Sequence, residues 1–158
     1  MRRTRGRVVL HGLGIGALAV TLSLSLTACG PVAKELSNGD FAETIPAALA
    51  EAGIGVTDSF AAKGLDGFTF YMGVGVDLDH DDLSPDDLAT ILRVILEHND
   101  VPSDQIRLSV DDSEGETIDV PAVVENIDPD LETRAGSYGG LSVTNDQAAA
   151  IIEAVWGE

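Results

Sequence analysis

Twelve consecutive residues near the middle of the chain, 68–79, alternate strictly between apolar side chains and polar or small ones. Successive side chains of a β-strand point to opposite faces of a sheet, so this period of two predicts a strand with one buried face. The apolar positions are Phe68, Phe70, Met72, Val74, Val76 and Leu78. One-sided burial is typical of antiparallel sheets. The segment therefore predicts an antiparallel pairing, and Asp66-Gly67 before it predicts a hairpin turn.

Other patterns supply the helices that would cover this strand. Apolar residues recur at helical spacing over 41–52, 85–98 and 145–156, and the last two runs follow the capping residues Ser84 and Thr144. Further strands are expected over 56–63, 106–110 and 138–143, and residues 117–120 either pair back or lead into a short helix over 121–127. We therefore expect a single acidic α+β domain over 40–158. Its architecture would be a small two-layer sandwich of the ferredoxin-like type, with a mostly antiparallel sheet and helices on one face.

The amino terminus has the pattern of an export signal. Residues 1–7 contain four arginines, residues 8–26 are apolar apart from His11 and a few hydroxyl residues, and Ala28 precedes the only cysteine, Cys29. This order is typical of a secretory leader. Leu26-Thr27-Ala28-Cys29 resembles the lipobox of bacterial lipoprotein precursors at every position. In its excess of Arg over Lys, the composition of the chain resembles that of small actinobacterial lipoproteins. An uncleaved signal anchor and a chance cysteine beside an ordinary cleavage site are the alternatives.

The resemblance to lipoprotein precursors implies a domain organisation and a location. Cleavage between Ala28 and Cys29 would remove residues 1–28 as a signal peptide, and Cys29 would carry a diacylglyceryl group on its sulfur. Residues 29–39 would be a lipidated tether that holds the domain at the extracytoplasmic face of the cell membrane. A diacylglyceryl group carries two acyl chains. Two chains anchor a protein stably, whereas membrane binding through a single chain is marginal. The expected membrane contact is therefore made through lipidated Cys29.

The charge of the chain excludes several classes of partner. The chain has 9 basic and 27 acidic residues, and removal of the leader would leave five basic residues against all 27 acids, a net charge of −22. Phosphate binding needs clustered Lys and Arg, so we expect no nucleic-acid partner. A strongly negative surface keeps a tethered domain from adhering to an anionic envelope, and it also attracts a basic protein.

The densest group of potential metal ligands is formed by Asp77, Asp79, Asp81 and Asp82. Alternate carboxylates can bind Ca²⁺, and the first three have the spacing that opens an EF-hand loop. The pattern then departs from that loop, because Asp82 stands where a glycine is needed and Leu88 where the bidentate glutamate belongs. Two interpretations remain: a solvated strand exit before an acidic helix start, and a weak site for Ca²⁺ or another cation.

Residues suited to catalysis are scarce. No serine lies in a Gly-x-Ser-x-Gly elbow, and lipidation would consume the only cysteine. His80 and His98 are expected at the surface, with a zinc site as the alternative. We therefore predict no catalytic residues and favour a non-enzymatic envelope lipoprotein that acts by binding an unknown envelope protein or as a structural module. A calcium- or cation-binding surface module and a hydrolase or small-ligand carrier are the alternatives.

Overall fold

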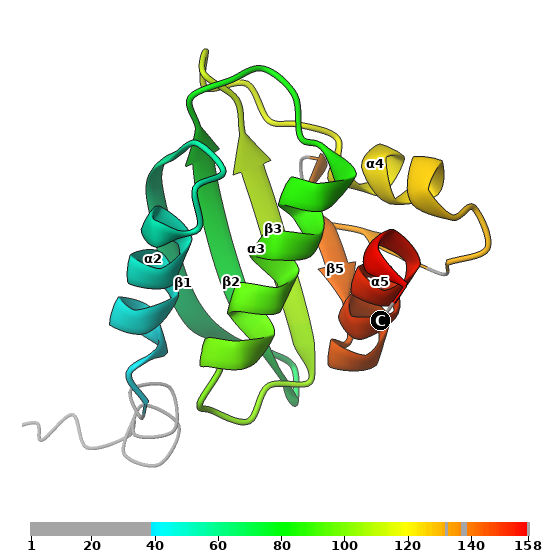
Figure 1. Ribbon diagram of the computed structural model, residues 1–158. Coiled ribbons are helices and arrows are strands. Elements are labelled where there is room, and N and C mark those ends of the chain that lie inside the picture. Colours follow the sequence, from blue (N-terminus) through cyan, green and yellow to red (C-terminus); the bar gives the residue numbers. More distant parts are fainter. Residues whose placement is uncertain (1–38, 132, 137–138, 158) are drawn as a thin grey trace, which may run out of the picture.

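The computed structural model describes residues 39–131, 133–136 and 139–157 (Figure 1). In these ranges the helices are α2 (Phe41–Glu51), α3 (Pro85–His98), α4 (Val120–Ile127) and α5 (Asn145–Trp156). The strands are β1 (Val56–Asp66), β2 (Thr69–Leu78), β3 (Gln105–Asp111), β4 (Arg134–Ala135) and β5 (Leu141–Val143). The signal peptide, the cleavage site, Cys29 and nearly all of the tether lie outside the described residues, so their assignment stays a prediction.

The five strands form one sheet in the order β1-β2-β3-β5-β4. β1 pairs antiparallel with β2, and β5 pairs antiparallel with both β3 and β4. β2 and β3 are parallel, because α3 returns the chain along one face of the sheet between them. The sheet is thus mostly antiparallel, as predicted, but β2 is antiparallel only towards β1.

The helices form a second layer on one face of the sheet. Figure 1 shows α2, α3 and α5 in front of the strands. Alternate residues of the central strands and the apolar stripe of α3 are buried between the two layers: Met72, Val74, Val76 and Leu78 from β2, Ile106, Leu108 and Val110 from β3, and Leu88, Ile91, Leu92 and Ile95 from α3. Removing this apolar surface from water is the main force that holds the layers together. The predicted α+β two-layer sandwich is confirmed, and it is consistent with the ferredoxin-like type.

Capping side chains set where α3 and α5 begin. The Ser84 hydroxyl accepts a hydrogen bond from the backbone N–H of Asp87 at 3.1 Å. At α5, the Thr144 hydroxyl accepts from the N–H of Gln147, and the Gln147 side-chain oxygen accepts from the N–H of Thr144. This reciprocal pair is a capping box, which satisfies backbone donors that a helix start would otherwise leave free. Both predicted helix starts are confirmed.

The prediction for Phe68 is wrong. Its place in the alternating pattern puts it on the buried face, yet its side chain has a relative accessibility of 103%. The reason is the position of the turn: β1 continues to Asp66 and β2 begins only at Thr69, so Phe68 belongs to the connection between the strands. The alternating pattern continues through the turn, whereas the sheet does not.

The segment 117–127 combines both of the structures that its sequence allows. The N–H of Ile118 donates to the carbonyl oxygen of Val110 at 2.8 Å, and Thr117 forms an isolated bridge with Asp111. The chain then enters α4, whose first turn is capped by the Asp119 carboxylate. The segment therefore pairs back briefly before it becomes helical.

Candidate interaction surface

The face of the sheet opposite the helices is accessible to solvent. Residues paired across β1, β2, β3 and β5 share this face, since directly opposed residues of neighbouring strands point the same way. We call it the open face; its members on these strands and on β4 include Phe60, Ala62, Gly64, Tyr71, Gly73, Gly75, Arg107, Ser109, Arg134 and Ser142. Small side chains and glycines dominate its centre, which leaves the few large side chains prominent.

Two aromatic rings lie close over glycines of the neighbouring strand. A Cβ atom on Gly75 would overlap the ring of Phe60, and one on Gly64 would overlap the ring of Tyr71. Both glycines have ordinary backbone angles, so the space above them, rather than a special φ, is what a side chain would disturb. Phe60 nevertheless keeps a relative accessibility of 63%, which is high for an aromatic side chain in a sheet. The open face thus presents aromatic surface to solvent.

Arg107 links the aromatic part of the open face to its polar side. Its guanidinium carbon lies 3.9 Å from the centroid of the Tyr71 ring, and one guanidinium nitrogen donates to a carboxylate oxygen of Asp66 at 2.7 Å. Stacking on the Tyr71 ring and ion pairing with Asp66 together fix the position of the guanidinium group. Its side chain is still 37% exposed, so further donors remain available to a ligand.

Arg107 and Arg134 line one groove of about 340 Å³ on the open face, together with Asp66, Gln105 and Ser142. Only two other Lys or Arg residues fall in the described ranges, Lys63 and Arg93. A domain with a large excess of acids therefore gathers half of its described cationic side chains at this groove. Guanidinium groups that line one groove suit a carboxylate of a partner, because the donors of a guanidinium match both carboxylate oxygens.

Sequence reasoning did not identify these arginines. The alternation of Ile106, Leu108 and Val110 already assigns Arg107 to the opposite side of its strand. Its meeting with Tyr71, Asp66 and Arg134 depends on the order of the strands, which no local pattern contains. The available signal was the scarcity of basic residues in the domain.

The predicted cation ligands extend from the end of β2 into the loop that follows it. Asp77 is the last open-face residue of that strand, and the backbone of Asp79 pairs with Gly55. Asp81 accepts a hydrogen bond from the Ser113 hydroxyl, and Asp82 is exposed, with its carbonyl oxygen bonded by His80. Among the described residues no three His, Cys, Asp or Glu side chains are grouped as a metal site. The Ca²⁺ interpretation therefore stays a prediction.

The fold brings other carboxylates next to this loop that the sequence pattern did not indicate. Asp77 and Asp79 share a depression of about 350 Å³ with Asp111 at the end of β3 and with Asp112 and Glu114 from the turn after it. One side-chain oxygen of Asp111, Oδ1, is shielded from solvent and has no hydrogen-bond partner. The parallel register of β2 and β3 explains the meeting, because it sets Asp77 opposite Asp111.

Both ring nitrogens of His80 face backbone carbonyl oxygens. Nε2 lies 3.2 Å from the Ile54 oxygen and Nδ1 lies 2.7 Å from the Asp82 oxygen. Two acceptors require two N–H donors, so these contacts favour the imidazolium and raise the pKa of His80 above its ordinary value of 6.5, the contact with Ile54 contributing most. His98 is the last residue of α3, a helix of 14 residues and about 21 Å that begins five residues after His80, so the length of this helix lies between the two histidines.

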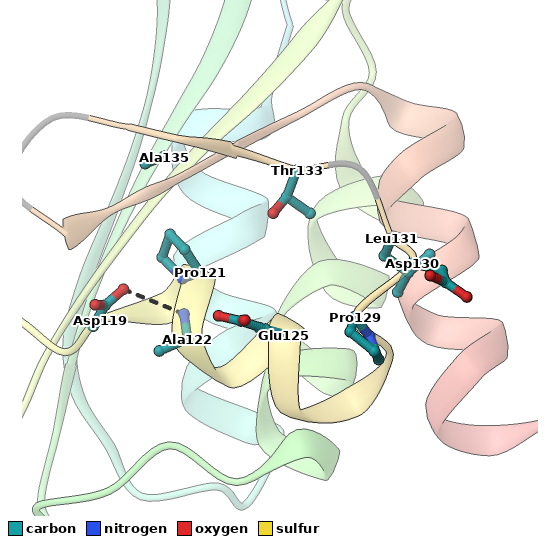
Figure 2. Close-up of a pocket in the computed structure, with 9 residues that line it drawn as sticks. All are labelled: Asp119, Pro121, Ala122, Glu125, Pro129, Asp130, Leu131, Thr133 and Ala135. Atoms are coloured by element: carbon teal, nitrogen blue, oxygen red, sulfur yellow. Dashed lines mark hydrogen bonds between the residues drawn. The ribbon is translucent and has the colours of Figure 1, made fainter.

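A further depression of the surface lies between α4 and the chain leading into β4 (Figure 2). It has a volume of about 710 Å³, and Figure 2 shows Glu125 of α4 on one side and Thr133 on the other. Asp119 is engaged in capping, since it accepts from the N–H of Ala122 at 3.2 Å. The described lining residues include carboxylates but no histidine, lysine or cysteine. This depression is the place to look for the predicted alternative of a small-ligand carrier.

No family model, curated protein or solved structure matches the chain. In the described ranges, no helix combines the length and the apolar character needed to cross a bilayer. A functional interpretation therefore depends on the amino-terminal sequence and on the surfaces described above.

Proposed function

We propose that the chain is a membrane-anchored extracytoplasmic lipoprotein whose acidic domain binds another protein of the cell envelope and catalyses no reaction. The anchor is supported by Leu26-Thr27-Ala28-Cys29 after a basic and apolar leader. The binding role is carried by one observation: Phe60 stands 63% exposed on the open face, which also presents the stacked Tyr71 and Arg107. Aromatic residues and Arg are the side chains most enriched at the centres of protein interfaces.

The anchor is tested by fractionation and mass spectrometry. The wild-type protein is expected in the membrane fraction, with an intact mass equal to residues 29–158 plus a diacylglyceryl group. Cys29→Ser should release the chain from the membrane, because no lipidated sulfur remains. A Cys29→Ser chain that stays as firmly bound to membranes as the wild type would contradict the anchor.

The open face is tested by photo-crosslinking in intact cells. A benzoylphenylalanine at Ala62, an exposed residue of β1 on the open face, should yield a discrete crosslinked product. The matched control is Ala149, an exposed alanine of α5 in the helical layer, which should yield none. Identical product patterns at the two positions, or no product at Ala62, would contradict binding through this face.

Cation binding is the second candidate, and it is favoured by the unbonded, shielded Oδ1 of Asp111 beside Asp77 and Asp79. Such an oxygen is satisfied by a bound cation or by water. Calorimetric titration with Ca²⁺ after chelation should show heat that is lost in Asp111→Asn. Absence of heat, together with an unchanged melting temperature at millimolar Ca²⁺, would exclude this candidate.

A further inference from the structure

The large apolar side chains that are exposed in the described residues all belong to the β1–β2 hairpin. They are Phe60 on the open face, Leu65 near the end of β1 with a relative accessibility of 39%, and Phe68 at the turn with 103%. We call residues 65–68 the hairpin tip. Phe68 has no part in the core and none in the open face, so neither the fold nor the proposed protein contact accounts for it.

The hairpin tip lies at the same end of the molecule as the point where the tether enters the domain (Figure 1). The N–H of Asp40 donates to the Asp100 carboxylate at 2.7 Å, in the loop between α3 and β3. Asp104 in the same loop bonds the backbone of Phe70 twice, through its N–H at 2.9 Å and through its carboxylate at 3.1 Å. Phe68 is therefore two positions away from Phe70, which this loop binds. The same loop also binds Asp40, where the tether ends.

We propose that the hairpin tip enters the membrane to which Cys29 is anchored, with Phe68 in the interface between headgroups and acyl chains. This inference rests on the proposed lipid anchor. It assigns a second, weaker membrane contact that fixes how the domain is oriented. The exposed tip would contact the lipids of the bilayer to which Cys29 is anchored.

The length of the tether favours this end of the domain. Eleven Cα–Cα steps join Cys29 to Asp40, and they span at most about 40 Å. β2 alone has ten residues and a length of about 33 Å. The far end of the sheet would reach the bilayer only with the tether at nearly full extension, whereas the hairpin tip reaches it at any extension.

The chemistry of the tip suits a lipid interface more than a charged surface. Its one charged side chain, Asp66, is paired with Arg107 at 2.7 Å, and its other members are Leu65, Gly67 and Phe68. The domain as a whole is strongly acidic, so attraction to anionic headgroups cannot hold it there. Burial of the Phe68 ring supplies the attraction to lipid. Because Cys29 already anchors the chain, the tip is held at a high effective concentration next to the bilayer.

The test uses the mature lipidated protein in phosphatidylcholine vesicles. Since the Cys29 sulfur is acylated, Leu65→Cys provides the one free thiol, which is labelled with an environment-sensitive NBD fluorophore. The matched control carries the label at Glu114→Cys, an exposed turn residue at the opposite end of the sheet. We expect the emission at position 65 to shift to shorter wavelength and to be quenched by lipids with a spin label near the headgroup, and the emission at 114 to do neither.

A Phe68→Ser substitution in the Leu65→Cys chain should return the emission at 65 towards that of the control, without a change in the far-ultraviolet circular dichroism. Flotation of the protein with the vesicles tests the lipid anchor independently of the tip contact. A protein that does not float refutes the lipid anchor itself. A protein that floats while its label at 65 behaves as at 114 overturns the tip contact alone. A spectral shift without lipid quenching, growing with the protein-to-lipid ratio, assigns the tip to a second copy of the chain and also overturns it.

Discussion

The packing of Phe60 over Gly75 gives a quantitative test of the open face. Gly75→Ala adds a methyl group where the ring now lies, and the ring must move away. Phe60 buries a little over a third of its side chain. A Phe side chain of about 200 Å² and about 25 cal/mol per Å² then give a loss of up to about 2 kcal/mol. Ala in place of Gly in a strand returns about 0.5–1 kcal/mol. The net loss in the free energy of unfolding should be about 1 kcal/mol.

The control for this prediction is the same substitution in a Phe60→Ala chain. With the ring absent, Gly75→Ala should stabilise the protein by about 0.5–1 kcal/mol, so the two substitutions should couple by about 2 kcal/mol. The assay is urea denaturation of a chain that begins at residue 29 with Cys29→Ser, followed by circular dichroism. Effects of the two substitutions that add to within about 0.5 kcal/mol would refute the close contact of ring and glycine.

Three further predictions concern the fold. Because folding raises the pKa of His80 above 6.5, its protonated ring stabilises the fold below that pH, and this contribution is lost as the pH rises through the raised pKa. His80→Gln should flatten this part of the curve of stability against pH. An unchanged slope would contradict the two carbonyl contacts. Thr144→Ala removes the capping box and should cost about 1 kcal/mol in urea denaturation, with an unchanged m value. Ile106→Ala empties a fully buried site and should lower the free energy of unfolding by about 2–5 kcal/mol. Ser109→Ala, on the open face of the same strand, should change it by no more than about 0.5 kcal/mol. Equal losses would mean that the two faces of β3 are assigned wrongly.

Local patterns were sufficient where the structure depends on neighbouring residues. The alternation over 68–79 identified β2 and its buried face from Met72 to Leu78, and the residues around Ser84 and Thr144 identified two helix starts. Each of these signals acts within a few residues of backbone, through a pleat or a capping hydrogen bond. The same reasoning misplaced Phe68, because the alternating pattern contains no information on where the turn releases the strand from its partner.

The candidate surfaces were much less accessible to sequence reasoning than the elements that carry them. Asp77 and Asp79 were identified as a cluster, but their neighbour Asp111 comes from a strand more than thirty residues further along the chain. The alternation of apolar residues places Arg107 only on the polar side of its strand. Its role on the open face depends on Tyr71 from the adjacent strand and Asp66 from the one beyond. Such groupings depend on strand order and register, which are set by long-range packing.

The amino-acid sequence alone determined the excess of acidic residues and the division of the domain into strands and capped helices, and it is the sole basis for the predicted export and anchoring signal. These properties follow from residue types and from periods of two and 3.6 residues, which act locally. The tertiary structure decided that β3 lies parallel to β2, that one face of the sheet stays open with Phe60 exposed, and that the hairpin tip and the tether end share one end of the domain. The physical reason is that burying the apolar stripes of the helices covers only one side of the sheet, and it brings distant segments together as a consequence.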